Sequence, residues 1–82
     1  MARSLAVGDT VYIVGRYGYT NDHMVYVIQA KIYTIKNNRY HAYETLNDVF
    51  EWSFNESDYL KAVFKDRESA WRAAHELQKV KQ

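Results

Sequence analysis

Three histidines, a cluster of acids and a set of tyrosines are the residues of this 82-residue chain whose types could carry chemistry. The histidines, His23, His41 and His75, fall in segments that predict a loop, a strand and a helix, and their spacing matches no metal-ligand pattern. Cysteine is absent, which excludes a thiolate nucleophile, a disulfide and a cysteine-based zinc site. The sequence also contains no nucleophile elbow and no phosphate-binding glycine loop. We therefore expect a non-enzymatic protein with no metal and no cofactor.

The acids are concentrated in one segment. Residues 44–58, ETLNDVFEWSFNESD, contain five acids and no basic residue, although the whole chain has a formal net charge of +1. We predict that Asp48, Glu51, Glu56 and Asp58 form an acidic patch that steers a partner toward the chain, because charges at the rim of an interface act mainly on encounter. The alternative is structural, since VFEWSF alternates aromatic with polar residues as a half-buried strand does.

A second candidate for partner binding is the stretch GRYGYTNDH at positions 15–23. Its glycines and its Asn-Asp pair predict a loop. Arg16, Tyr17 and Tyr19 belong to the residue types that dominate binding energy at protein interfaces, so we predict that these three supply the contact. The alternative is a surface loop whose tyrosines fold back onto the domain.

The elements that must position these residues are predicted strands followed by one helix. The expected strands cover about residues 9–14, 24–36, 39–45, 49–54 and 59–64. Asn37 and Asn38 predict a tight hairpin, because asparagine tolerates positive φ. The second strand changes its apolar face midway, with Tyr33 and Ile35 taking over from Ile32, which predicts a sharp bend.

The C-terminal segment predicts a helix over about residues 67–79, with Asp66 as its N-cap. Ala70, Ala73, Ala74, Leu77 and Val80 share one face at helical spacing and predict its packing surface. A chain of this length holds one core, so we expect a single domain over residues 1–82. The side chains expected in the core are Val11, Ile13, Ile28, Ile32, Phe50, Trp52, Phe54 and Leu77.

The segments VGDTVYIV, IQAKIYTIKNNRYHAYET, VFEWSF and AVFKDRESAWRAA, in this order, resemble the small SH3-like proteins of Gram-positive bacteria and their phages. In that group a GD-x-V-Y opening and a VF-x-(S/T/D)-(R/K)-E-x-A junction between strand and helix bracket a compact barrel. The junction residues in this chain are Val63, Phe64, Asp66, Arg67, Glu68 and Ala70. The resemblance implies a five-stranded antiparallel SH3-like barrel with one C-terminal α-helix.

Two functions follow from these observations as expectations. The first is a non-enzymatic protein-binding module, a phage or mobile-element accessory protein that occludes a host protein as anti-CRISPR-type inhibitors do. The alternative is a nucleic-acid-binding barrel, whose base-stacking and phosphate-binding residues would be Tyr17, Tyr19, Tyr43, Lys31, Arg39 and His41. A net charge of +1 argues against tight binding to phosphate. No apolar run approaches the roughly 20 residues that span a bilayer, so we expect a cytoplasmic protein that does not insert into membranes.

Overall fold

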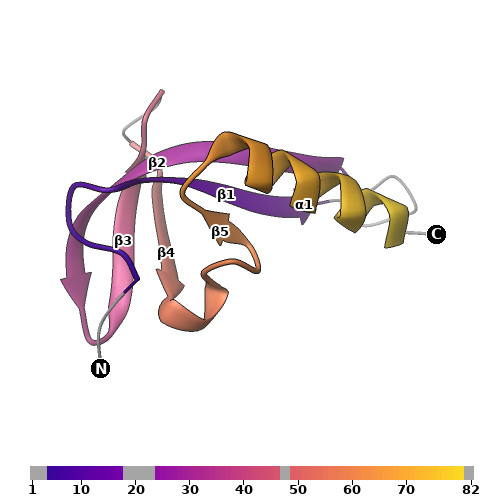
Figure 1. Cartoon of the computed structure of the whole chain (residues 1–82). Helices are drawn as coiled ribbons and strands as arrows, with labels where there is room; N and C mark the ends of the chain where they lie inside the picture. Colours follow the sequence, from indigo (N-terminus) through magenta and orange to yellow (C-terminus); the bar gives the residue numbers. More distant parts are fainter. Residues whose placement is uncertain (1–3, 18–23, 47–48, 81–82) are drawn as a thin grey trace.

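Five antiparallel strands and one C-terminal helix build the protein, as the computed structural model shows (Figure 1). The structure describes residues 4–17, 24–46 and 49–80, without the side chains of Arg16, Tyr17, Met24 and residues 78–80. The elements are β1 (Thr10–Tyr17), β2 (Met24–Lys36), β3 (Arg39–Glu44), β4 (Glu51–Asn55), the 3₁₀ helix η1 (Glu56–Asp58), β5 (Val63–Phe64) and α1 (Arg67–Val80). The strands form one sheet in the order β4-β3-β2-β1-β5, which curls into a half-barrel.

The curl of the sheet depends on β2, which is long enough to pair with two neighbours in succession. Its first part pairs with β1 and its last part with β3, and the register shifts between Ile32 and Thr34. Tyr33 is therefore an extra residue, and such a bulge bends and twists a strand. The predicted bend is confirmed, but only Ile35 joins the core beyond it, whereas Tyr33 is 42% exposed.

The turn between β2 and β3 has the predicted form. Asn37 and Asn38 have φ values of 51° and 64°, and the flanking residues Lys36 and Arg39 pair directly. Two successive positive φ values match the right-handed twist of the flanking strands. The hairpin therefore sets the register of β3, and through it the register of β4.

The concave face of the half-barrel holds the larger core. It contains Leu5, Val11, Ile13, Ala30, Ile32, Tyr40, Ala42, Phe54 and Val63, with Ile35, Trp52 and Tyr59 packed half-buried against it. The predicted burial of Val11, Ile13, Ile32 and Phe54 is confirmed, whereas Ile28 and Trp52 are only half-buried.

The helix covers the opposite face of β1 and β2 with a second, smaller core. Val14 and Phe64 contact Ala70 and Ala74 there, and Leu77 is half-buried at the edge. Asp66 caps α1 as predicted, because its carboxylate accepts the Ser69 backbone N–H at 2.8 Å. That hydrogen bond lowers the pKa of Asp66 below its usual value. Because a core lies against each face of β1, both sets of its alternating side chains pack in a core.

Candidate interaction surface

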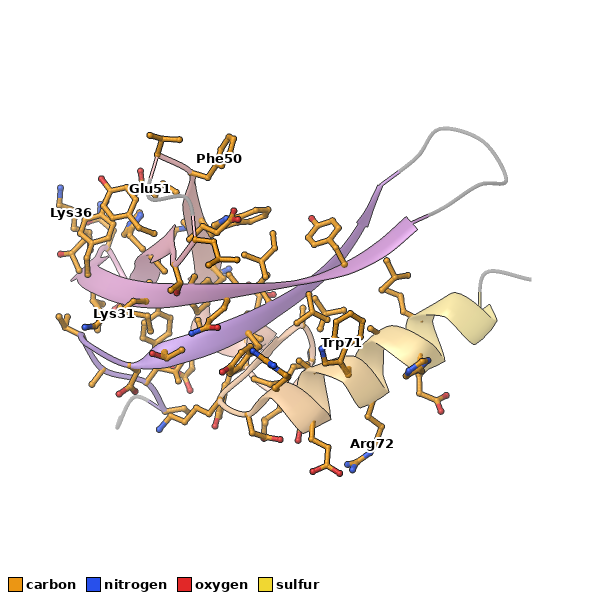
Figure 2. All side chains as sticks on the ribbon, turned by 90° about the horizontal axis from the view of Figure 1, so that it is seen from above. Lys31, Lys36, Phe50, Glu51, Trp71 and Arg72 are labelled. Carbon is orange, nitrogen blue, oxygen red and sulfur yellow. The ribbon has the colours of Figure 1, made fainter. Side chains whose placement is uncertain are left out.

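The outer face of β2, β3 and β4 carries the described cluster of aromatic and charged side chains that best suits recognition. His41 pairs with Ser53, and Tyr43 pairs with both Glu51 and Lys31, so side chains of three strands share this face. Tyr33, which alternates with the buried Ile32, lies on the same face next to Tyr43. Figure 2 shows Lys31, Lys36 and Glu51 at the end of the sheet far from α1.

Tyr33 and Tyr43 form a stacked pair at the centre of this face. Their ring centroids are 4.4 Å apart with an interplanar angle of 17°, and the two residues are 42% and 39% exposed. The Tyr33 hydroxyl donates a hydrogen bond to the Glu51 carboxylate, which also lies 3.4 Å from His41 Nδ1. The hydrogen bond to Glu51 raises the pKa of Tyr33 above its ordinary value, because it stabilises the neutral phenol. We call Tyr33 and Tyr43 the tyrosine platform.

Basic side chains share the outer face with the tyrosine platform. Lys31 and Lys36 are exposed on β2. On β3, Arg39 donates hydrogen bonds to Asn55 Oδ1 at 2.7 Å and to Ser53 Oγ at 3.3 Å, which orient its guanidinium along the sheet. Glu51 contacts Tyr33 and His41, so the outer face carries a carboxylate next to the platform as well as cations.

Three large apolar side chains are exposed where β3 and β4 begin to separate. Leu46, Val49 and Phe50 are 92%, 75% and 54% exposed, and we call them the apolar rim. The prediction that Phe50 is buried is wrong. The Glu44 N–H donates to the Phe50 carbonyl. The N–H of Thr45, the residue after Glu44, donates instead to the Gln29 carbonyl on β2, so the chain separates from β4 at this point. No described element therefore covers the Phe50 ring at this end of the sheet.

Among the described acids of the predicted steering patch, Glu51 lies apart from Glu56 and Asp58. Glu51 opens β4, whereas Glu56 and Asp58 lie in η1 beyond its other end, about 16 Å away at the rise of an extended strand. Glu56 accepts hydrogen bonds from the Tyr40 hydroxyl and from Ser4, and Asp58 accepts the Asn55 N–H at 2.9 Å. Asp48 lies outside the described residues. A role of these acids in partner binding stays a prediction.

The predicted binding loop falls only partly within the described residues. Arg16 and Tyr17 belong to the end of β1, where their backbones pair with Val25 and Met24, and Tyr19 lies outside the described residues. The proposed contact through these three side chains stays a prediction. Sequence reasoning assigned Tyr33 to the buried face of β2, but alternation with the buried Ile32 places Tyr33 on the outer face, and the bulge after it brings Ile35 to the core. The available signal was the alternation along Ala30, Lys31, Ile32 and Tyr33, because successive side chains of a strand point to opposite faces.

Among the described residues, no group of three or more His, Cys, Asp or Glu side chains is placed to hold a metal ion. In the same part of the chain, no helix has both the length and the apolar character needed to cross a membrane. Comparison of the chain with models of protein families, with curated proteins and with solved structures returned no match.

Proposed function

We propose that this protein is a non-enzymatic, SH3-like protein-binding module that contacts its partner through the tyrosine platform and the apolar rim. A sharply bent antiparallel sheet whose first strand pairs with the last supports the SH3-like assignment. The resemblance in sequence supports a phage or mobile-element accessory protein that occludes a host protein. The partner surface would carry acidic groups around an apolar centre, to match Lys31, Lys36 and Arg39 around Tyr33 and Tyr43.

The observation that carries this proposal is the preorganised stack of Tyr33 on Tyr43. Both rings are exposed, yet the hydrogen bond to Glu51 and the mutual stacking restrict their rotamers before any partner arrives. Side chains that are already ordered lose little entropy on binding, and tyrosine is enriched at interfaces for this reason. The exposed residues Leu46, Val49 and Phe50 add apolar side chains at the end of β3 and β4, where a partner could also make contact.

The test is capture of a partner from a lysate of a Gram-positive bacterium, followed by titration of the purified partner. Tyr43→Ala should weaken binding by about 2 kcal/mol, as loss of a central aromatic anchor does. Trp71→Ala is the matched control, because Trp71 is a 46% exposed aromatic on α1, far from the platform (Figure 2). Loss of binding with Trp71→Ala alone would contradict the proposal and place the interface on the helix. Loss with Tyr17→Ala and Tyr19→Ala alone would place it on the loop after β1.

A second candidate function for this surface is binding of single-stranded nucleic acid, favoured by three cations around two stacked tyrosines. Exposed aromatic faces stack bases, and Lys31, Lys36 and Arg39 would meet phosphates. With a net charge of +1, we expect no affinity tighter than the non-specific range of about 10⁻⁴–10⁻⁶ M at physiological salt. Anisotropy titrations with labelled RNA and DNA oligonucleotides measure this. Submicromolar affinity with a steep salt dependence, lost in Tyr43→Ala, would make nucleic acid the ligand.

A further inference from the structure

β4 is an edge strand of the sheet, because it pairs with β3 on one side and with no described strand on the other. The Glu44 N–H donates to the carbonyl of Phe50, the residue that the register places opposite it, so the backbone groups of Phe50 face β3. Backbone groups alternate in direction along an antiparallel strand. The N–H and C=O groups of Glu51, Ser53 and Asn55 therefore face the open edge.

The part of this edge that can accept a further strand runs from Glu51 to Ser53. Both residues are exposed, and no described residue hydrogen-bonds to their backbone groups on this side. Asn55 differs, because its N–H already donates to the Asp58 carboxylate at 2.9 Å. An open row of backbone N–H and C=O groups is a template for pairing with another chain.

We propose that two copies of this chain associate by antiparallel pairing of their β4 edges, which joins the two sheets into one. The same edge serves on both copies, and a contact of this symmetric kind closes at a dimer. Symmetric registers that bring the outward-facing groups together place Glu51 opposite Glu51, Ser53 or Asn55 of the second copy. The register can therefore be chosen on physical grounds.

The favoured register places Glu51 opposite Ser53 of the second copy. Two glutamates directly opposite each other would repel. Pairing with Asn55 would require the N–H that already donates to Asp58. In the favoured register each Glu51 exchanges both of its main-chain hydrogen bonds with Ser53 of the second copy, and the Asn55–Asp58 contact stays intact.

Charge complementarity supports the same register. The Arg39 guanidinium extends over β4 on the outer face and donates to Ser53 Oγ at 3.3 Å. Paired residues share a face, so the Glu51 carboxylate of the second copy would lie beside Ser53, next to this guanidinium. Symmetry repeats the contact. A carboxylate has about four acceptor positions, so Glu51 can keep its contacts with Tyr33 and His41.

The pairing also covers apolar side chains on the concave side of the edge. Trp52 is half-buried there, and Phe50, which shares its face by alternation, is 54% exposed. Figure 2 shows Phe50 and Glu51 at the same end of the sheet, away from α1. In the favoured register Trp52 lies opposite Trp52 of the second copy, and Phe50 lies opposite Phe54. Cross-strand aromatic pairs of this kind stabilise a sheet.

The dimer would present two tyrosine platforms on one outer face, because both copies contribute to a single sheet. Two linked sites raise the avidity for a partner that carries two copies of the target surface. This consequence depends on the proposed function, whereas the pairing of β4 does not. Tyr43→Ala, which tests the platform, should therefore leave the association of the chain unchanged.

Sedimentation velocity of the full chain from about 1 µM to about 1 mM tests the association, since dimers of micromolar or weaker affinity titrate within this range. We expect a sedimentation coefficient that rises from the monomer to the dimer value. Amide hydrogen exchange should show concentration-dependent protection of the Glu51 and Ser53 N–H groups. A monomer at every concentration, or protection confined to other elements, would overturn the proposal.

Ser53→Pro and Ser53→Ala form a matched pair of variants. Proline removes only an N–H that faces the open edge, and proline is tolerated at such positions. We expect the dimer dissociation constant of Ser53→Pro to be at least about tenfold higher than that of Ser53→Ala, because symmetry removes the main-chain hydrogen bond twice. The melting temperature at low concentration checks the fold. Equal dissociation constants in two folded variants would contradict the pairing of β4.

Reversal of charge provides a test that keeps every backbone N–H. Arg39→Glu and Glu51→Arg should each weaken the dimer, because each places like charges beside one another across the edge. The double variant should restore association, because the reversed charges again attract. A double variant that associates no more tightly than either single variant would overturn the proposed pairing, as would a dimer that only Trp71→Ala abolishes.

Discussion

Two tyrosines of the sheet, Tyr40 and Tyr33, each donate a hydroxyl hydrogen bond to a glutamate of the acidic segment 44–58, but in opposite environments. Tyr40 is 1% exposed, and its ring stacks on Phe54 at a centroid distance of 5.3 Å. Its partner Glu56 also accepts hydrogen bonds from Ser4, so this pair joins β3, η1 and the N-terminal segment. Tyr33 is 42% exposed, and its partner Glu51 lies on the open face of the sheet.

The difference between the pairs lies in burial and not in the chemistry of the hydrogen bond. A buried ring places its hydroxyl at the margin of the core, where a missing acceptor would leave an unsatisfied polar group. An exposed ring can exchange the same hydrogen bond for one to water at little cost. The Tyr40–Glu56 pair therefore stabilises the fold, whereas the Tyr33–Glu51 pair orients side chains that are open to solvent.

The largest expected effect separates the two rings. Tyr40→Ala should cost about 3–5 kcal/mol of unfolding free energy, because it leaves a cavity beside Phe54 in the concave core. Against a total stability of about 5–15 kcal/mol for a single domain, this approaches unfolding. Urea denaturation measures the loss. Tyr43→Ala, on the platform, is the matched control and should change stability by no more than about 0.5 kcal/mol. Similar losses in the two variants would mean that the platform is part of the core.

A smaller effect separates the two hydroxyls. Tyr40→Phe keeps the ring and removes the donor to Glu56, and we expect it to cost about 1.5 kcal/mol, as for a hydrogen bond to a charged group. Tyr33→Phe should leave the melting temperature unchanged, because its ring and its acceptor are open to water. Thermal denaturation of both variants under one condition provides the comparison. Equal shifts in melting temperature would show that burial does not distinguish the pairs.

The smallest effect concerns ionisation. In an absorbance titration, Tyr33 should ionise at a pH above the ordinary tyrosine pKa, because its hydrogen bond to Glu51 raises its pKa. Glu51→Gln should lower that pKa toward the ordinary value of about 10, and Tyr33→Phe should remove the transition. The folded-state pKa is raised, so any stabilisation from this pair is present below about pH 10 and is lost as the pH rises through the folded-state value. An unchanged titration in Glu51→Gln would contradict the hydrogen bond.

Local chemistry accounts for the parts of this structure that the sequence predicts correctly. Asp66 caps α1, Asn37 and Asn38 form the hairpin, and Val11 and Ile13 enter the core by simple alternation. Each of these features depends on neighbours within a few residues along the chain, so the identity of those residues determines it. The mainly β architecture with one C-terminal helix follows from the same signals.

The tertiary structure alone decided which aromatic and acidic residues reach the surface. Phe50 shares the alternation of Trp52 and Phe54, but its exposure depends on where β3 leaves β4. Tyr33 stays on the outer face while Ile35 reaches the core, because the register against β3 shifts by one residue between them and such a shift moves a side chain to the other face. Glu51 and Glu56 are alike in sequence, and only distant partners, Tyr33 on β2 and Tyr40 on β3, assign one to an open surface and the other to the closed end of the core. These outcomes depend on contacts between distant segments, which the local sequence pattern does not specify.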